Sequence, residues 1–273
     1  MKVINSIKEI SINESVCLAL GNFDGIHKGH AQLLEKCVEL ARKEGFRSAV
    51  FTFNDLTLNA VKGKMSVKRV LSLKEKERLL EELGVDYLIT VPFDGEIMKK
   101  TPEEFLKLLE DSLDLKYIVC GFDYRFGFKA AGNTELLAME SGKAGFTLEV
   151  IPEYTVEGTT ASSTLLRKLV RTAEFEEFKM FTERSYYISS DSLTLETSAR
   201  NSADFKVDPA IEVPEEGLYP CTIVSGKNRE TATAMITHAE NGAILSVGAR
   251  DPLVIEILLG YVGTSDFRVE FMN

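Results

Sequence analysis

Short apolar runs alternate with amphipathic stretches in the first two thirds of the chain. Val16–Leu20 has the length and composition of a buried strand, and residues 30–44 repeat apolar side chains at helical spacing. The same alternation predicts further strands at residues 48–53, 87–91, 117–120 and 147–151, and helices at residues 73–83, from residue 102 and at residues 134–144. Short strands that alternate with helices are typical of a parallel sheet with helices on both faces.

The pattern changes near residue 182. Six short β-like runs follow, separated by turn-forming residues, at 186–189, 193–197, 217–225, 231–237, 243–247 and 267–272. This spacing is typical of a small antiparallel barrel or sandwich. We therefore predict an α/β protein with a doubly wound, Rossmann-like parallel sheet in residues 1–183 and a small antiparallel β-barrel domain in residues 184–273.

Composition narrows the classes of function. A formal net charge of −10 disfavours nucleic-acid binding through phosphate contacts, and no apolar run has the roughly 18 residues needed to span a bilayer. The start of the chain shows no signal-peptide core. Four widely spaced cysteines form no metal or redox pattern, so we expect reduced thiols in a cytoplasmic protein. The sequence does not indicate the oligomeric state.

The strongest chemical signal is a glycine-rich segment between the first strand and the first long helix. Its characteristic residues are Gly21, Asn22, Phe23, Asp24, His27, Gly29 and His30. In an open α/β sheet this is the carboxyl end of a strand, where ligands bind. The helix that follows offers free N–H groups and its positive dipole end to an anion. The segment therefore predicts a phosphate-binding turn, whose glycines let the backbone approach the ligand.

His27 and His30 are three residues apart, so both imidazoles can project toward one anion. Adenylyl transfer needs mainly the positioning of reactants and the stabilisation of charge on the phosphates of ATP. Histidine donors meet that need, and Mg²⁺ brought with ATP neutralises the remaining charge, so no separate protein metal site is predicted. The alternative is a pair of ordinary packing residues. Because these are two of only three histidines, in a glycine-rich strand–turn–helix junction, the phosphate site is favoured.

A second group of polar residues begins a later helix. Ser162, Ser163 and Thr164 precede an apolar-periodic stretch, and Arg167 lies one turn in, where it can hydrogen-bond a phosphate. Hydroxyls at a helix start also act as simple caps, which is the structural alternative. Together with the first segment, this group predicts a triphosphate held from two sides.

A third segment, residues 121–127, follows the strand predicted at residues 117–120. Its aromatic rings could flank a planar ligand while Asp123 bonds the polar edge of that ligand. Inward packing of the same rings in a tight loop explains the composition equally well.

In this order, the three segments resemble the bacterial FAD synthetase family, the bifunctional riboflavin kinase/FMN adenylyltransferases. The family carries G-x-F-D-G-x-H-x-G-H, G-x-D-F-x-F-G and S-S-T-x-[IL]-R segments, which residues 21–30, 121–127 and 162–167 match closely. The resemblance covers residues 15–190. It implies that FMN attacks ATP, with Mg²⁺, to yield FAD and pyrophosphate.

The resemblance also implies roles for individual residues. His27, His30 and Arg167 would be catalytic through contacts with the ATP phosphates. Asp123 and Arg125 would lie near the flavin or its phosphate. The nucleotide would be bound by Gly21, Asn22, Phe23, Asp24, Gly29, Ser162, Ser163 and Thr164.

The sequence departs from the family pattern in two places. The family's T-F-x-P-H-P segment corresponds to residues 52–57, which contain neither proline nor histidine, and this bears on the flavin side of the site. In the second domain, residues 197–201 stand where the kinase half has G-[FY]-P-T-A-N, without its proline–threonine pair, while Glu256 matches the kinase's catalytic glutamate. We interpret this domain as a kinase-like barrel that has lost riboflavin phosphorylation.

Two other functions stay open on sequence grounds. The altered segment after the second strand is compatible with a related adenylyl- or cytidylyltransferase acting on another small substrate. The degraded kinase pattern is compatible with a flavin- or nucleotide-binding regulator that does not turn over its ligands.

Overall fold

The structure, a computed structural model, describes residues 1–57, 59, 67–239, 242–250, 254, 255, 258, 259 and 267–272. The chain forms two compact units. The first consists of Met1–Val67 and Lys76–Thr160, and the second of Lys68–Glu75 and Ala161–Asn273. Glu256, the predicted counterpart of a catalytic glutamate, lies outside the described residues.

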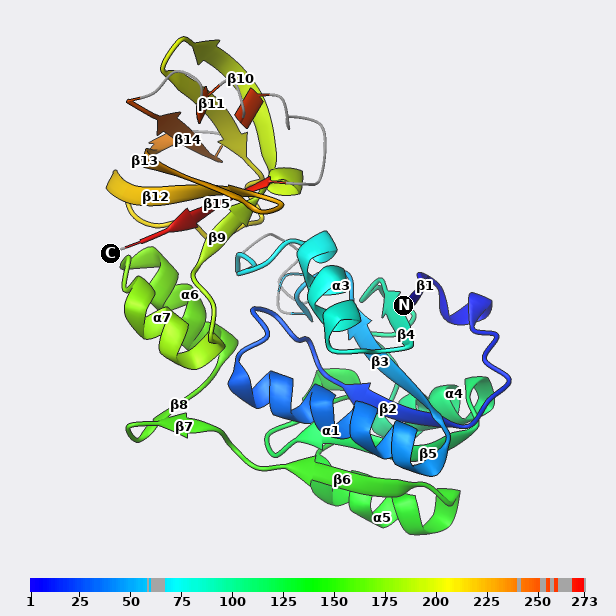
Figure 1. Ribbon diagram of the computed structural model, residues 1–273. Coiled ribbons are helices and arrows are strands. Elements are labelled where there is room, and N and C mark those ends of the chain that lie inside the picture. Colours follow the sequence, from blue (N-terminus) through cyan, green and yellow to red (C-terminus); the bar gives the residue numbers. More distant parts are fainter. Residues whose placement is uncertain are drawn as a thin grey trace. The chain divides into compact units, whose positions relative to one another are not determined.

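The first unit is built on a parallel sheet with the strand order β1-β4-β3-β2-β5-β6 (Figure 1). All of its neighbouring strands pair in parallel. The strands are β1 (Lys2–Ile4), β2 (Val16–Leu20), β3 (Arg47–Phe53), β4 (Tyr87–Val91), β5 (Leu115–Gly121) and β6 (Thr147–Ile151). The order reverses at β2, where Leu20 lies beside Phe51 of β3 on one side and Cys120 of β5 on the other. The carboxyl ends of β2 and β5 therefore flank the position where doubly wound sheets bind ligands.

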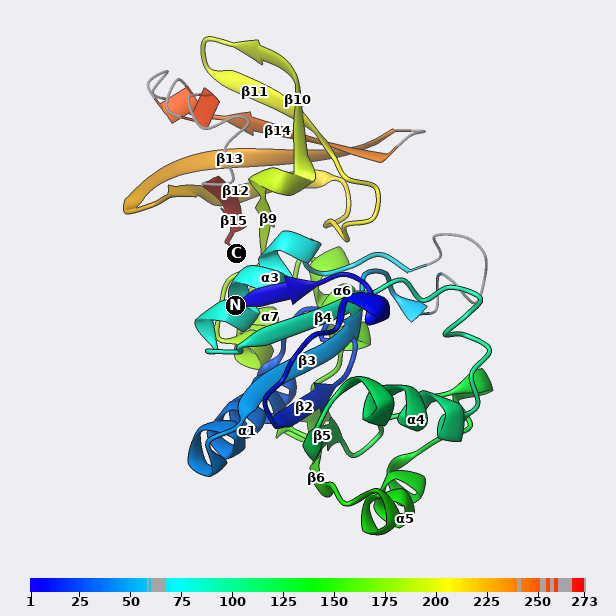
Figure 2. The ribbon, with the colours of Figure 1, turned by 90° about the vertical axis from the view of Figure 1, so that its right-hand side faces the viewer.

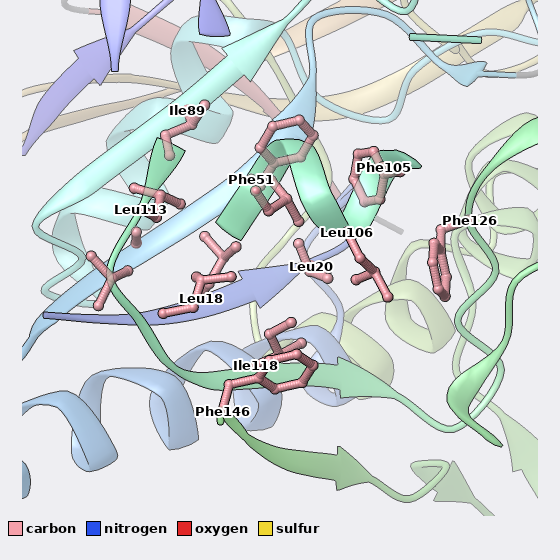
Figure 3. Close-up of a cluster of buried hydrophobic side chains, with 14 of the residues drawn as sticks. Leu18, Leu20, Phe51, Ile89, Phe105, Leu106, Leu113, Ile118, Phe126 and Phe146 are labelled. Atoms are coloured by element: carbon pink, nitrogen blue, oxygen red, sulfur yellow. The ribbon is translucent and has the colours of Figure 1, made fainter. Parts of the chain in front are cut away.

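Helices cover both faces of this sheet. Figure 2 shows α1 (Lys28–Glu44) on one side of the strands and α4 (Pro102–Ser112) and α5 (Thr134–Ala144) on the other. All five residues of β2 are buried, as expected for a strand packed on both faces. On the α4 side, alternate strand residues such as Leu18 and Leu20 join Phe105 and Leu106 in one core (Figure 3).

Local sequence signals explain where several helices begin. Thr101 and Glu104 form the reciprocal hydrogen bonds of a capping box at the start of α4, with Pro102 at the first helical position. Ser72 accepts a hydrogen bond from the Glu75 amide at 3.1 Å, at the start of α3 (Leu73–Glu82). Five of the described α-helices and strands were not predicted from the hydrophobic pattern, because they are short or contain many polar residues. They are β1, β7 (Thr155–Val156), β8 (Thr159–Thr160), α7 (Phe175–Thr182) and β11 (Ser202–Val207).

The second unit is built on an antiparallel sheet with the order β10-β11-β14-β13-β12-β15-β9, curled into a half-barrel (Figure 1). Besides β11, its strands are β9 (Tyr187–Ser189), β10 (Leu193–Ala199), β12 (Gly217–Ser225), β13 (Asn228–Ala239), β14 (Gly242–Gly248) and β15 (Phe267–Phe271). The predicted fold class, a Rossmann-like parallel sheet followed by a small antiparallel β-structure, is confirmed.

Two helices share the core of the second unit. The ring of Phe175, at the start of α7, lies 6.1 Å from the ring of Tyr186 and 5.5 Å from that of Phe271 in β15. The side chain of Arg171, at the end of α6 (Ser163–Arg171), donates to Glu212 at 3.1 Å. These contacts explain why the second compact unit begins at Ala161. A functional domain boundary between residues 183 and 184 stays a prediction.

The segment Lys68–Glu75 belongs to the second unit although it lies early in the chain. Arg69 forms two backbone hydrogen bonds, from its amide to the carbonyl of Ala210 at 2.6 Å and from the Glu212 amide to its carbonyl at 2.7 Å. The phenol of Tyr187 donates to the Glu75 carboxylate at 2.9 Å. Helix α3 then carries the chain back into the first unit at Lys76.

All four cysteines are free and buried. The Cys37 thiol donates to the carbonyl of Cys17 at 3.2 Å. Burial raises the pKa of Cys120 to about 12, with a contribution from the charge of Asp123, and burial alone raises the pKa of Cys221 to about 12. Because the thiolate is the reactive form, these side chains behave as small hydrophobic groups.

We expect the native protein to resist thiol reagents at pH 8. Cys120 and Cys221 stay protonated far above this pH, and burial shields Cys17 and Cys37 from the reagent. Counting modified thiols by absorbance should give almost none in the native protein and all four after denaturation. Fast stoichiometric labelling of a native thiol would contradict the buried assignment.

Among the described residues, no helix has the length and apolarity required to cross a membrane.

Candidate active site

The turn between β2 and α1 has a strained backbone. Phe23 and Ile26 have φ angles of 50° and 36°, in the left-handed region that non-glycine residues seldom adopt, and Gly25 has a φ angle of 77°. Both non-glycine side chains are buried, with exposed fractions of 0% and 4%. Such conformations persist only where the surrounding structure holds them, and they are frequent at functional sites. The strain therefore singles out this turn at the switch point of the sheet.

The two histidines of the turn are stacked at the start of α1. The imidazole centroids of His27 and His30 are 3.7 Å apart, with an angle of 19° between the ring planes. Nδ1 of His27 accepts a hydrogen bond from the His30 amide at 3.2 Å, so His27 is the N-cap of α1. An accepting Nδ1 places the proton of the neutral ring on Nε2, which makes Nε2 a donor. Helix α1 begins at Lys28, earlier than predicted, because an imidazole supplies the cap that the sequence pattern did not reveal.

Two glycines of the turn make room for aromatic rings. A Cβ atom on Gly21 would lie 2.8 Å from the ring of Phe23. A Cβ atom on Gly29 would lie 3.2 Å from Nδ1 of His27 and 3.3 Å from Cβ of Tyr154. The ring of Phe23 meets the His30 imidazole edge-on, at a centroid distance of 5.3 Å. The glycine spacing of the motif is therefore required by how the rings pack, in addition to any approach of a phosphate.

Two residues that the sequence analysis missed hold the backbone of the same turn. Nζ of Lys76 donates to the carbonyl oxygen of Asn22 at 3.0 Å, and the hydroxyl of Thr52 donates to the same oxygen at 3.2 Å. The side chain of Lys76 is buried, with an exposed fraction of 5%. One signal could have revealed it, since Lys76 occupies the helical stripe of Leu73 and Leu80. A lysine in an apolar stripe marks a polar partner inside the protein.

Lys28, inside the motif, and Tyr154, beside it, were not predicted as site residues. The Lys28 ammonium lies 5.9 Å from the centroid of the Tyr154 ring, within the range of a cation–π contact. Asp24, which was predicted, is buried with an exposed fraction of 2%.

The loop after β5 divides its aromatic side chains between core and surface. Phe126 joins the core of the sheet, and Tyr124 stacks on it at a centroid distance of 5.7 Å. Phe122, by contrast, is 47% exposed. Asp123 and Arg125 are both exposed. Inward packing therefore accounts for part of this loop, and one ring and two charges stay available for a ligand.

The β2–α1 turn and the loop after β5 leave adjacent strands at the same edge of the first unit, because Leu20 pairs with Cys120. The structure thus brings two of the three predicted segments together. The third, containing Ser162, Ser163, Thr164 and Arg167, belongs to the second compact unit.

The altered segment after β3 has its own hydrogen bonds. The side-chain amide of Asn59 donates to the carbonyl of Val67 at 2.8 Å and accepts from the Val67 amide at 2.9 Å. The Asn59 side chain also donates to the Asp55 carboxylate at 3.4 Å, and Leu56 is buried. Residues unlike those of the family pattern therefore still have hydrogen-bond partners after β3.

The predicted second clamp is ordered by local hydrogen bonds. The hydroxyl of Ser162 accepts from the Leu165 amide at 3.1 Å and caps α6. The guanidinium of Arg167 donates to the hydroxyl of Thr164 at 3.0 Å, one turn away. Capping therefore accounts for the hydroxyl of Ser162. The hydrogen bond to Thr164 orients the Arg167 side chain along the first turn of α6.

Helices α1 and α6 share an unusual charge pattern. Among the α-helices with described bounds, these two alone lack an acidic residue in the first turn, whereas α3, α4, α5 and α7 each have at least one glutamate there. Acidic residues normally stabilise a helix start through its dipole. Both predicted phosphate segments therefore begin helices without a first-turn carboxylate that would repel an external anion.

In the second unit, the stretch that corresponds to the kinase motif forms part of a hairpin. Residues 197–199 belong to β10, and Arg200 and Asn201 make the turn into β11, where Ala199 pairs with Ser202. Among the described residues, no group of three or more histidine, cysteine or carboxylate side chains is placed to hold a metal ion.

The family model and the relatives found by comparison with known proteins agree on one family. The FAD synthetase family model matches residues 9–165. The bifunctional riboflavin kinase/FMN adenylyltransferase of Escherichia coli strain K12 is 34% identical over 171 residues, covering 62% of this chain and 55% of that protein. The protein of the same name from Listeria monocytogenes is 27% identical over 210 residues, covering 74% of this chain and 66% of that protein. The chain thus spans little more than half the length of the Escherichia coli relative.

A solved structure shares the fold over the whole chain. The crystal structure of the macrolide-efflux protein from Streptococcus pneumoniae superposes with a TM-score of 0.82 and covers 100% of this chain and 89% of that chain. At 22% identity, this likeness shows the fold alone.

Proposed function

Because the chain belongs to the FAD synthetase family, we propose that it transfers the adenylyl group of ATP to FMN, giving FAD and pyrophosphate. An oxygen of the FMN phosphate attacks the α-phosphorus of ATP, and a new P–O bond forms. The bond from the α-phosphorus to the bridging oxygen breaks, and pyrophosphate leaves with the electron pair. The observation that carries this proposal is the stacked pair of His27 and His30 at the start of α1, on the switch point of the sheet.

The chemistry demands hydrogen-bond donors where negative charge grows on the phosphates. His27 supplies Nε2–H, since its Nδ1 is occupied by the cap. His30 stacks against it, and the N–H groups at the start of α1 add the positive end of the helix dipole. Gly21, Asn22, Phe23, Asp24 and Gly29 shape the nucleotide-binding turn.

A second set of phosphate donors is proposed on α6. Ser163, Thr164 and the Arg167 guanidinium, on the first turn of α6, bind phosphate oxygens, while Ser162 caps the helix. The acid-free first turns of α1 and α6 support this assignment, because a phosphate takes the place of the usual glutamate. Mg²⁺ enters bound to ATP and offsets the remaining charge.

FMN lies on the β5 side of the same sheet edge in this proposal. Arg125 contacts the flavin phosphate and Asp123 a polar edge of the flavin, and both side chains are exposed at the end of β5. Phe122, also exposed, offers an aromatic surface to the planar ring system.

The second unit does not phosphorylate riboflavin in this proposal. The proline–threonine pair of the kinase motif is missing, and the corresponding residues lie in the β10–β11 hairpin. The unit contains α6, which carries Arg167.

The direct test is incubation of the purified protein with FMN, ATP and Mg²⁺, followed by chromatography. We expect FAD to form only when all three are present, and riboflavin with ATP to give no FMN. Absence of FAD above the level of a His30→Ala control would exclude the proposed reaction.

The same assay separates the alternatives. FAD analogue formation with CTP in place of ATP would indicate a cytidylyltransferase. Quenching of flavin fluorescence without turnover would indicate a regulator, and absence of any flavin binding would indicate a transferase with another acceptor substrate.

A further inference from the structure

The carbonyl group of Asn22 receives two side-chain hydrogen bonds. Nζ of Lys76 and the hydroxyl of Thr52 reach it at 3.0 and 3.2 Å from α3 and β3. This carbonyl belongs to the peptide group between Asn22 and Phe23. The two bonds therefore fix the orientation of one peptide plane at the start of the predicted nucleotide-binding turn.

The orientation of that plane controls the strained residue that follows it. Rotation of a peptide plane changes ψ of the preceding residue and φ of the following residue together. Phe23 has a φ angle of 50°, which an unrestrained phenylalanine leaves for the negative region. Holding the Asn22 carbonyl therefore holds Phe23 in its left-handed conformation.

Phe23 in turn contacts the predicted catalytic pair. Its ring folds back over Gly21, where a Cβ atom would lie 2.8 Å away, and meets the His30 imidazole edge-on at 5.3 Å. His30 is stacked on His27 at 3.7 Å. A continuous set of contacts thus runs from the ammonium of α3 to both imidazoles.

We propose that Lys76 is a positioning residue, which holds the Asn22–Phe23 peptide in its strained orientation and so sets the direction of the His30 imidazole. This rests on the proposed function for its catalytic meaning. Burial of an ammonium is costly, and a charged donor holds a carbonyl more strongly than a neutral one. Thr52 donates a weaker, neutral hydrogen bond to the same carbonyl oxygen.

The test uses Lys76→Met, which keeps the length of the side chain and removes the donor, and Thr52→Val, which removes the second bond. Lys74→Met is the matched control, because Lys74 is exposed on the same helix. The chain has only three histidines, so carbon–proton spectra of the imidazoles resolve His27, His30 and His238 individually.

We expect Lys76→Met to move the His30 signal as the Phe23 ring turns away, with the His238 signal unchanged. The dissociation constant of α,β-methylene-ATP with Mg²⁺ should rise about tenfold. This is the effect expected when one charge-assisted hydrogen bond that positions the site is lost. Thr52→Val should move the His30 signal in the same direction by less, and Lys74→Met should resemble the unmodified protein.

Unchanged His30 signals and nucleotide affinity in the folded variants would overturn the proposal. If circular dichroism shows that Lys76→Met does not fold, the His30 signal and the nucleotide affinity of Thr52→Val test the proposal instead. Unchanged values in that variant would overturn it. The spectra and the binding constant need no turnover, so a protein that makes no FAD would refute the proposed function and leave the positioning role of Lys76 open to this measurement.

Discussion

Replacement of His30 by alanine is expected to lower kcat for FAD formation by about 10²–10³, the effect of removing one preorganised donor to a charged transition state. His30 is the better choice for this test because His27 is also the N-cap of α1. Loss of a cap typically costs about 1 kcal/mol of stability, which would mix a folding defect with a catalytic one.

His238→Ala is the matched control for His30→Ala. His238 lies in β13 of the second unit, and its ring nitrogen lies 3.3 Å from the carbonyl of Pro214. Steady-state rates of FAD formation should be near normal in this variant and strongly reduced in His30→Ala. Equal rates in the two variants would remove His30 from the reaction.

Gly127→Ala is expected to lower the free energy of unfolding strongly. Gly127 has a φ angle of 73°, and a Cβ atom there would lie 2.6 Å from the backbone nitrogen of Pro102 at the start of α4. With a ψ angle of 179°, Gly127 adopts a conformation that is essentially restricted to glycine, so alanine costs about 1–3 kcal/mol there, and overpacking adds about 1–3 kcal/mol. We expect the free energy of unfolding, measured in denaturant, to fall by about 2–6 kcal/mol.

Gly142→Ala provides a control with the opposite sign. Gly142 lies inside α5, and no heavy atom lies within 4 Å of the position of its added Cβ. Alanine in a helix interior is more stable than glycine by about 0.5–1 kcal/mol. If both variants unfold at the same denaturant concentration, the close contact between the Gly127 loop and α4 is not present in solution.

Hydrophobic patterning predicted the architecture of the first unit well, because both faces of its strands are buried. The run Val16–Leu20 is the strand β2, and residues 134–144 form α5 as predicted. The hydroxyls of Thr101 and Ser72 accept hydrogen bonds at the starts of α4 and α3. These signals are local, since each depends on residues within one or two turns of the chain.

The pattern was less informative where polar side chains point into the protein. The hydrophobic pattern predicts a helix at residues 73–83 but does not predict that the ammonium of Lys76 is buried against the Asn22 carbonyl. The cap formed by His27 was missed because imidazole is an uncommon capping group. The assignment of residues 68–75 to the second unit depends on hydrogen bonds to residues more than a hundred positions away.

The sequence by itself determined the alternation of strands and helices, the start of the antiparallel part and the position of the glycine- and histidine-rich turn between the first strand and the first long helix. Residue type and spacing are enough for these features, because periodic burial and hydrogen-bonding capacity are properties of neighbouring residues. Only the tertiary structure decided which strands lie side by side, that His27 and His30 stack, and that a lysine from α3 holds the turn. Such contacts join residues distant along the chain, and their geometry follows from the packing of the whole sheet.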